Sequence, residues 1–283
     1  MRFARHGRPG SEHPIVSGAD GIWRDLSPVT DDVTAEVLTL GERELALPRL
    51  SPVPDIARFG PPLPPLTGIG KIVCIGLNYR DHARETGAQL PTEPIVFLKA
   101  PDTVVGAQDE VRIPRNSSKT DWEVELAVVI GAQARYLPDP ESALACIAGY
   151  TISNDVSERE FQLERGGQWD KGKNCETFNP LGPWITTPDE IADPQALGLR
   201  LWVNGQLRQR GTTSDMIFDV PYLVWYLSQF MVLHPGDIIN TGTPAGVALG
   251  MADPSYLRAR DVVELEIDSL GKQRQTFTAS EAH

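Results

Sequence analysis

A two-residue alternation runs through Asp121-Trp122-Glu123-Val124-Glu125-Leu126-Ala127-Val128-Val129-Ile130, as expected for a β-strand. One face of this strand is apolar, and it comprises Val124, Leu126, Val128 and Ile130. Glu123 and Glu125 share the other face, which continues with Ala127 and Val129. Because apolar residues follow the two glutamates on their own face, we expect the pair to line a half-buried site rather than open surface.

Two carboxylates side by side repel each other unless they share a proton or a cation. A hard divalent ion such as Mg²⁺ suits them, because it prefers carboxylate oxygen. The alternative is an ordinary solvated strand face, and the pair alone leaves that alternative open.

The other patterns around this strand predict a mostly β protein with some helix. Strands are expected at 71–76, 94–98, 122–131, 148–154, 182–187, 198–204, 237–241, 262–267 and 273–278. Helices are expected at 79–87, 140–146, 156–165 and 219–232. Because helices do not alternate regularly with the strands, a doubly wound sheet is not expected.

A proline cluster between residues 48 and 68 predicts a stiff, extended linker. We therefore expect a small N-terminal domain with this linker at 1–70, and a larger domain at 71–283.

Composition restricts the class of protein. Of the 283 residues, 26 are basic and 38 acidic, a net charge of −12, which argues against nucleic acid or an anionic membrane as the main partner. No apolar run is long enough to span a bilayer, and the N-terminal segment lacks the apolar core of a signal peptide. The three cysteines are scattered, which favours reduced thiols. These features predict a cytoplasmic protein.

Two further segments place polar groups where a strand or helix begins or ends. In Thr151-Ile152-Ser153-Asn154-Asp155, a strand ends in Asp155, and Arg159 and Gln162 follow on one face of the next element. Taken alone, Asp155 is better explained as a helix N-cap than as a site residue. His82 and Glu85 are three residues apart, so the carboxylate could hold the imidazole; an exposed surface pair is the alternative.

Two glycine-containing loops complete the set of candidates. Lys173 lies in a Gly- and Pro-rich loop between Trp169 and Phe178, which could cover it, although loop lysines are usually solvated. The segment Gly242-Thr243-Pro244 allows close approach of the backbone and offers a hydroxyl, and a tight structural turn explains it as well. Cys175 has no activating histidine nearby and is interpreted as a bystander.

Together these segments resemble the fumarylacetoacetate hydrolase family, in its order and spacing, over roughly residues 71–278. The resemblance implies that Mg²⁺ or Mn²⁺ is held by Glu123, Glu125 and Asp155. It implies catalytic roles for His82, Glu85 and Lys173. It implies substrate contacts from Arg159, Gln162, Thr177 and Thr243.

The resemblance further implies a mixed β-sandwich roll, preceded by the small N-terminal domain, in a homodimer. The stretch 163–173 looks most like the bacterial branch that hydrolyses 2,4-diketo-3-deoxy sugar acids and includes proteins named ureidoglycolate lyases. The expected activity is metal-dependent cleavage of a carbon–carbon bond in a small anionic diketo acid, with release of pyruvate. Glu85, through His82, would draw a proton from the attacking water. Alternatives are a ureidoglycolate lyase, an oxaloacetate decarboxylase, a hydroxymuconate-type isomerase or a non-catalytic binding protein.

Overall fold

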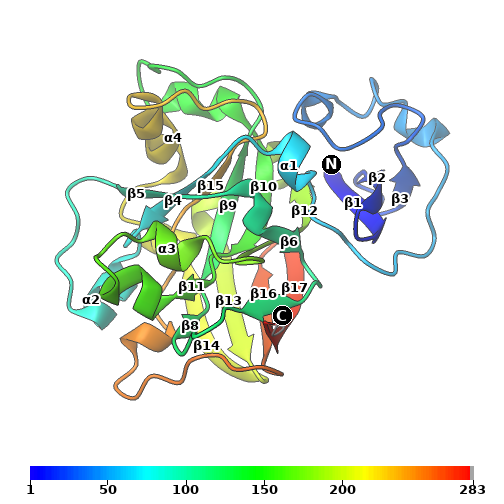
Figure 1. The fold of residues 1–283 in the computed structure, drawn as a ribbon. Coiled ribbons are helices and arrows are strands. Elements are labelled where there is room, and N and C mark those ends of the chain that lie inside the picture. Colours follow the sequence, from blue (N-terminus) through cyan, green and yellow to red (C-terminus); the bar gives the residue numbers. More distant parts are fainter. Residues whose placement is uncertain (281–283) are drawn as a thin grey trace.

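The computed structural model describes residues 1–280, which form mostly strands (Figure 1). The strands are β1 (Arg2–Arg8), β2 (Ser11–Ser17), β3 (Trp23–Asp25), β4 (Ile72–Gly76), β5 (Ile95–Lys99), β6 (Val104–Gly106), β7 (Val111–Ile113), β8 (Thr120–Asp121), β9 (Val124–Ile130), β10 (Ile147–Asn154), β11 (Ser157–Glu158), β12 (Asn179–Thr186), β13 (Gly198–Val203), β14 (Gln206–Thr212), β15 (Ile238–Asn240), β16 (Val262–Ile267) and β17 (Gly271–Ala279). The α-helices are α1 (Pro65–Gly68), α2 (Arg80–Thr86), α3 (Asp170–Lys173) and α4 (Val220–Ser228). The mostly β fold predicted from the sequence is confirmed.

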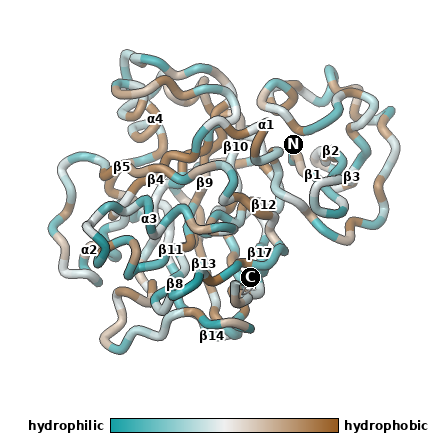
Figure 2. The backbone as a smooth tube through the Cα atoms, viewed as in Figure 1, coloured by the Kyte–Doolittle hydropathy of each residue, from teal (hydrophilic) through white to brown (hydrophobic). Residues whose placement is uncertain are grey.

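Two mixed sheets build the sandwich. The larger has ten strands in the order β3-β2-β1-β12-β10-β9-β15-β4-β5, with β6 paired to β12. The smaller has the order β14-β13-β16-β17-β7. Most neighbours are antiparallel, and the pairs β4–β15, β6–β12 and β7–β17 are parallel. Hydrophobic residues follow the inner strands β4 and β9 for most of their length (Figure 2).

Strand β9 lies at the centre, and both of its faces are buried. Val124, Leu126, Val128 and Ile130 join the core cluster that includes Leu199, Leu201, Val263 and Leu265 of the smaller sheet. Ala127 and Val129 join a second cluster on the opposite face, with Phe3, Val16 and Ile185. The predicted separation of the two faces is therefore confirmed, and the face that carries Glu125 is the one covered by the second cluster.

The N-terminal strands extend the large sheet, because β1 pairs with β12 at Arg2–Thr186 and Phe3–Ile185. They lie at one side of the molecule, away from α2 and α3 (Figure 1). The segment after them contacts both parts of the chain, since Arg58 forms ion pairs with Glu12 at 3.0 Å and with Asp109 at 2.6 Å. The division at residue 70 into two domains stays a prediction.

Two expectations about local structure need correction. The helix expected at 156–165 is absent: Ser157 and Glu158 form β11 and pair with β8, and only a single π-helical turn follows at Glu160–Glu164. Strands β6, β7, β8 and β14 were not expected, and the helix expected at 140–146 is a 3₁₀-helix at Glu141–Cys146. Helix α2 does end at Gly87, whose φ of +66° suits glycine. Within residues 1–280, no helix combines the length and apolar character that crossing a bilayer requires.

Candidate metal centre and active site

Three buried carboxylates meet where β9 begins and β10 ends. The antiparallel pairing places Asn154 opposite Val124, and the Asp155 N–H donates to the Glu123 carbonyl oxygen at 3.0 Å. Carboxylate oxygens of Glu123, Glu125 and Asp155 therefore lie within 4.8 Å of one another, and all three residues are buried. Asp155 is not a helix N-cap, because the next helical residue is Glu160 and the Asp155 carboxylate faces two lysines. The chain thus gathers the three residues that the sequence proposed as metal ligands.

Lys173 and Lys99 compensate this negative charge. The Lys173 ammonium, on α3, lies 2.8 Å from Glu123 Oε2 and 2.9 Å from Asp155 Oδ2. The Lys99 ammonium, at the end of β5, lies 2.5 Å from Asp155 Oδ1 and donates to the Val156 carbonyl oxygen at 3.1 Å. Lys99 was missed from the sequence; the available signal was its position two residues after buried Phe97, on the same face of the strand.

Arg159 fills the other side of Glu123. Its guanidinium contacts Glu123 Oε1 at 2.6 Å and Asp121 Oδ2 at 2.8 Å, and donates to Gln162 Oε1 at 3.0 Å. Asp121, also missed from the sequence, accepts from the N–H groups of Ala248 and Leu249 at 2.8 and 3.0 Å. Arg159 is therefore held in a fixed orientation by a planar, charge-assisted network.

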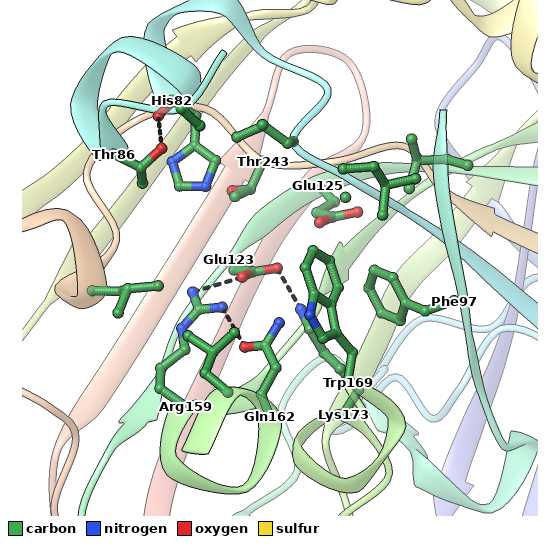
Figure 3. A pocket seen from close by; sticks show the side chains of 17 residues that line it. His82, Thr86, Phe97, Glu123, Glu125, Arg159, Gln162, Trp169, Lys173 and Thr243 are labelled. Atoms are coloured by element: carbon green, nitrogen blue, oxygen red, sulfur yellow. Dashed lines mark hydrogen bonds and ion pairs between the residues drawn. The ribbon is translucent and has the colours of Figure 1, made fainter. Parts of the chain in front are cut away.

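The His82–Glu85 pair on α2 forms as expected. His82 Nδ1 lies 3.1 Å from Glu85 Oε2, while Glu85 Oε1 accepts from the Gly246 N–H at 2.9 Å. With Nδ1 turned to Glu85, the Nε2 edge of the imidazole is the one that can serve a bound molecule. Figure 3 shows His82 on the wall across from Arg159 and Gln162, with Glu123 between them.

The two threonines proposed for substrate binding differ. Thr243 lines the cavity, donates to the Val124 carbonyl oxygen at 2.9 Å and accepts from Gln209 Nε2 at 2.8 Å. Thr177 is not among the cavity-lining residues of the described chain: its hydroxyl oxygen accepts from the Arg112 N–H at 2.8 Å and donates to the Glu176 carbonyl oxygen at 2.5 Å. The structure therefore brings together every proposed site residue except Thr177.

These side chains surround a cavity of about 240 Å³ (Figure 3). Its buried floor carries Glu123, Glu125, Arg159, Gln162, Lys173 and Thr243. Phe97 and Trp169 stand beside Lys173, whose ammonium lies 4.9 Å from the centre of the Phe97 ring. The cavity is large enough for a small organic acid and holds its charged groups away from solvent.

The pKa values follow from this charge arrangement. Burial opposes ionisation of Glu123, but Lys173 and Arg159 outweigh it and lower the pKa to about 2. Burial, reinforced by Asp155 and Glu123, raises the pKa of Glu125 well above its usual range. Burial opposes the charge on Lys173, yet Asp155 and Glu123 raise its pKa. Clustered, strongly shifted groups in a cavity are typical of a functional site.

Three converging carboxylates are the donor set that Mg²⁺ or Mn²⁺ prefers. Glu125 accepts from the Gly242 N–H at 2.8 Å, which orients it from outside the cluster. The residues therefore fit a divalent cation. By contrast, burial raises the pKa of Cys175 to about 11, in agreement with a bystander thiol.

Comparisons with known proteins agree with this geometry. Residues 71–278 match the family model described as Fumarylacetoacetate (FAA) hydrolase C-terminal. The chain is 49% identical over 278 residues to the 2,4-didehydro-3-deoxy-L-rhamnonate hydrolase of Sphingomonas sp., covering 97% of this chain and 95% of that protein.

Two solved structures extend the comparison. The fumarylacetoacetate hydrolase from Exiguobacterium antarcticum superposes with a TM-score of 0.88 at 35% identity, over 99% of this chain and 100% of that one. The maleylpyruvate hydrolase from Sphingobium sp., solved with manganese(II) and pyruvate, has a TM-score of 0.80 at 30% identity, again over 99% and 100%.

Proposed function

The chain belongs to the fumarylacetoacetate hydrolase family, and from that premise we propose that it hydrolyses a carbon–carbon bond in a 2,4-diketo acid to release pyruvate. One observation carries the proposal: a buried carboxylate triad shares its cavity with a histidine–glutamate pair. The triad suits a cation that stabilises an enolate, and the pair suits the activation of water. The rhamnonate hydrolase of Sphingomonas supports a 2,4-diketo-3-deoxy sugar acid as the substrate class.

Glu123, Glu125 and Asp155 would hold Mg²⁺ or Mn²⁺, and the manganese in the maleylpyruvate hydrolase structure supports a divalent cation. Once bound, such an ion supplies Lewis acidity at the 2-oxo group and compensates charge that develops on it. Lys99 would act as a positioning residue, because it fixes the Asp155 oxygen that Lys173 does not contact.

The other residues would bind the substrate and move protons. Arg159 and Gln162 would hold its anionic end, and Lys173 would place positive charge beside the developing oxyanion. His82 Nε2 would accept a proton from water as the water oxygen bonds to C4, while Glu85 stabilises the imidazolium. The C3–C4 bond would then break with its electron pair on C3, and a proton returned to C3 would complete pyruvate.

Rival reactions in this cavity differ in their need for water. Oxaloacetate decarboxylation and ureidoglycolate cleavage need no attacking water, so the His82–Glu85 pair favours hydrolysis over both. A hydroxymuconate-type isomerase would use a proton-transfer base without net cleavage. A non-catalytic role would leave the buried charges and the pair without a purpose.

We also propose a cytoplasmic homodimer. Val96 and Leu98 are exposed on one face of β5, an edge strand of the large sheet, and Phe230 is exposed after α4. Exposed apolar groups of this kind favour contact with a second copy. Light scattering coupled to gel filtration should return twice the chain mass, and a monomer would contradict the proposal.

The test of function is a substrate panel with Mg²⁺ present. Acylpyruvates, diketo-deoxy sugar acids, oxaloacetate, ureidoglycolate and hydroxymuconate-type acids would be followed by enol absorbance and by product analysis. We expect pyruvate and a second acid from diketo acids alone. Glu123→Gln and excess chelator should each abolish turnover, whereas Glu164→Gln, at an exposed ion pair with Lys119, should not. Full activity of Glu123→Gln would refute the metal role.

A further inference from the structure

The rim of the cavity differs chemically from its floor. Of the lining residues, Ile95 is 37% and Leu163 is 42% exposed, Thr86 and Ala88 are also exposed, and Leu249, Leu77 and Trp169 are half-buried. None of these seven carries an ionisable side chain. The acidic and basic lining residues lie on the buried floor, namely Glu123, Glu125, Arg159 and Lys173, with the His82 imidazole on the wall. A substrate whose carboxylate reaches the floor therefore turns its other end towards uncharged and mostly apolar groups.

Three cations lie close to the rim in sequence, and each contacts a group outside the cavity; Lys171, for example, donates to the Arg165 carbonyl oxygen at 2.7 Å. The Arg84 guanidinium donates to the Arg80 carbonyl oxygen at 3.2 Å. Arg165 pairs with Glu160 at 2.7 Å and stacks on the Phe161 ring at 4.2 Å. None of these side chains lines the cavity within the described residues. The rim is also held in place, because Leu249 N–H is bound by the same Asp121 carboxylate that orients Arg159.

Resting on the proposed function, we infer that the distal end of the substrate is uncharged and terminates in an alkyl or deoxy group. A second carboxylate at the rim would lose hydration against Leu163, Leu249 and Ile95, and the cations that line the cavity in the described chain, Arg159 and Lys173, lie on the buried floor. Placing a charge beside apolar groups without a partner is unfavourable. The cavity therefore selects monoanionic diketo acids and rejects diacids of equal length.

The kinetic test uses two substrates of equal chain length, 2,4-dioxoheptanoate and 2,4-dioxoheptanedioate. We expect kcat/KM for the monoacid to exceed that for the diacid by about tenfold or more, the scale of discrimination that an unpaired charge brings. Leu163→Arg should raise kcat/KM for the diacid and narrow the ratio, whereas Leu163→Gln, polar but uncharged, should not. Equal or faster cleavage of the diacid by the unaltered protein would overturn the inference. It would also be overturned if Leu163→Arg and Leu163→Gln lowered the monoacid-to-diacid ratio of kcat/KM by the same factor.

A binding test keeps the inference separate from the proposed reaction. The acids 2-oxoheptanoate and 2-oxoheptanedioate lack the 4-oxo group, so this chemistry cannot cleave them. Calorimetric titration with Mg²⁺ present should show tighter binding of the monoacid by about tenfold. Tighter binding of the monoacid without any cleavage of diketo acids would refute the proposed function alone. Equal affinity for both acids, or tighter binding of the diacid, would refute the inference, whatever the reaction.

Discussion

Replacing Lys173 with Met removes the ammonium between Glu123 and Asp155, at 2.8 and 2.9 Å. Breaking a buried ion pair typically costs about 3–5 kcal/mol. Here Glu123 keeps Arg159 at 2.6 Å and Asp155 keeps Lys99 at 2.5 Å, so the cost should lie near the lower limit. We therefore expect a loss of about 3 kcal/mol without metal, which lowers Tm by roughly 6–12 °C for a chain of this size.

A divalent cation should restore much of this loss, because it supplies positive charge to the same carboxylates. Ligand at 100 times its Kd stabilises a protein by about 2.7 kcal/mol. Thermal unfolding with chelator and with a Mg²⁺ series should therefore show a larger rise in Tm for Lys173→Met than for the unaltered protein. Lys171→Met is the matched control, since Lys171 lies on the same helix and, among residues 1–280, its ammonium donates only to the Arg165 carbonyl oxygen, at 2.7 Å.

The control should change stability by less than about 0.5 kcal/mol at every Mg²⁺ concentration. An unchanged Tm for Lys173→Met in chelator would show that its ammonium does not compensate the triad. An equal Mg²⁺ response in both proteins would show that the ion and the ammonium do not act on the same carboxylates.

Three further results are expected. His82→Ala should lower hydrolysis by about 10²–10⁴-fold and leave the Mg²⁺ affinity measured by calorimetry unchanged, so loss of both would remove His82 from water activation. The pKa of Glu125 is raised, and a bound cation needs the ionised carboxylate, so Mg²⁺ affinity should increase with pH. Calorimetric titrations in buffers of different ionisation enthalpy should detect the proton that is released. If Mg²⁺ binds without releasing a proton, Glu125 is not a ligand that must lose one. Folding lowers the pKa of Glu123 from 4.5 to about 2, so its ionised form contributes about 3 kcal/mol to the free energy of unfolding above pH 4.5. This contribution is lost as the pH falls towards 2. The difference in unfolding free energy between the unaltered protein and Glu123→Gln should therefore shrink over that range, and a growing difference would contradict the assignment.

The alternation of side chains in β9 was enough to predict that Glu123 and Glu125 share a face, because successive side chains of a strand point to opposite faces. The approach of Asp155 needed the antiparallel pairing of β9 with β10, and strands that follow each other in the chain commonly lie side by side in a sheet. The resemblance to a known family supplied the remaining roles, which spacing alone left open.

Other features depend on contacts that local patterns do not encode. Lys99 and Asp155 are 56 positions apart, and a lysine at a strand end has the same local signature whether it is buried or solvated. The helix expected at 156–165 is interrupted because Ser157 pairs with Asp121 of β8, a tertiary contact that overrides local preference. Thr177 lies in a loop and has a φ of +67°, which is rare for a β-branched residue. The direction in which its side chain points therefore could not be inferred from its spacing to Lys173.

The buried charges of the site explain why the metal, the proton on Glu125 and an uncharged rim belong together. An unbroken series of contacts joins Asp121, Arg159, Glu123, Lys173, Asp155 and Lys99, so three carboxylates are balanced by three cations. Glu125 lies beside this neutral series, and its raised pKa favours the neutral acid. A divalent cation held by these carboxylates would add positive charge to the floor, which a substrate carboxylate would offset. A second carboxylate would lie at the rim, where the exposed lining residues of the described chain carry no charge, so the charged floor and the uncharged rim favour the same monoanionic class of substrate.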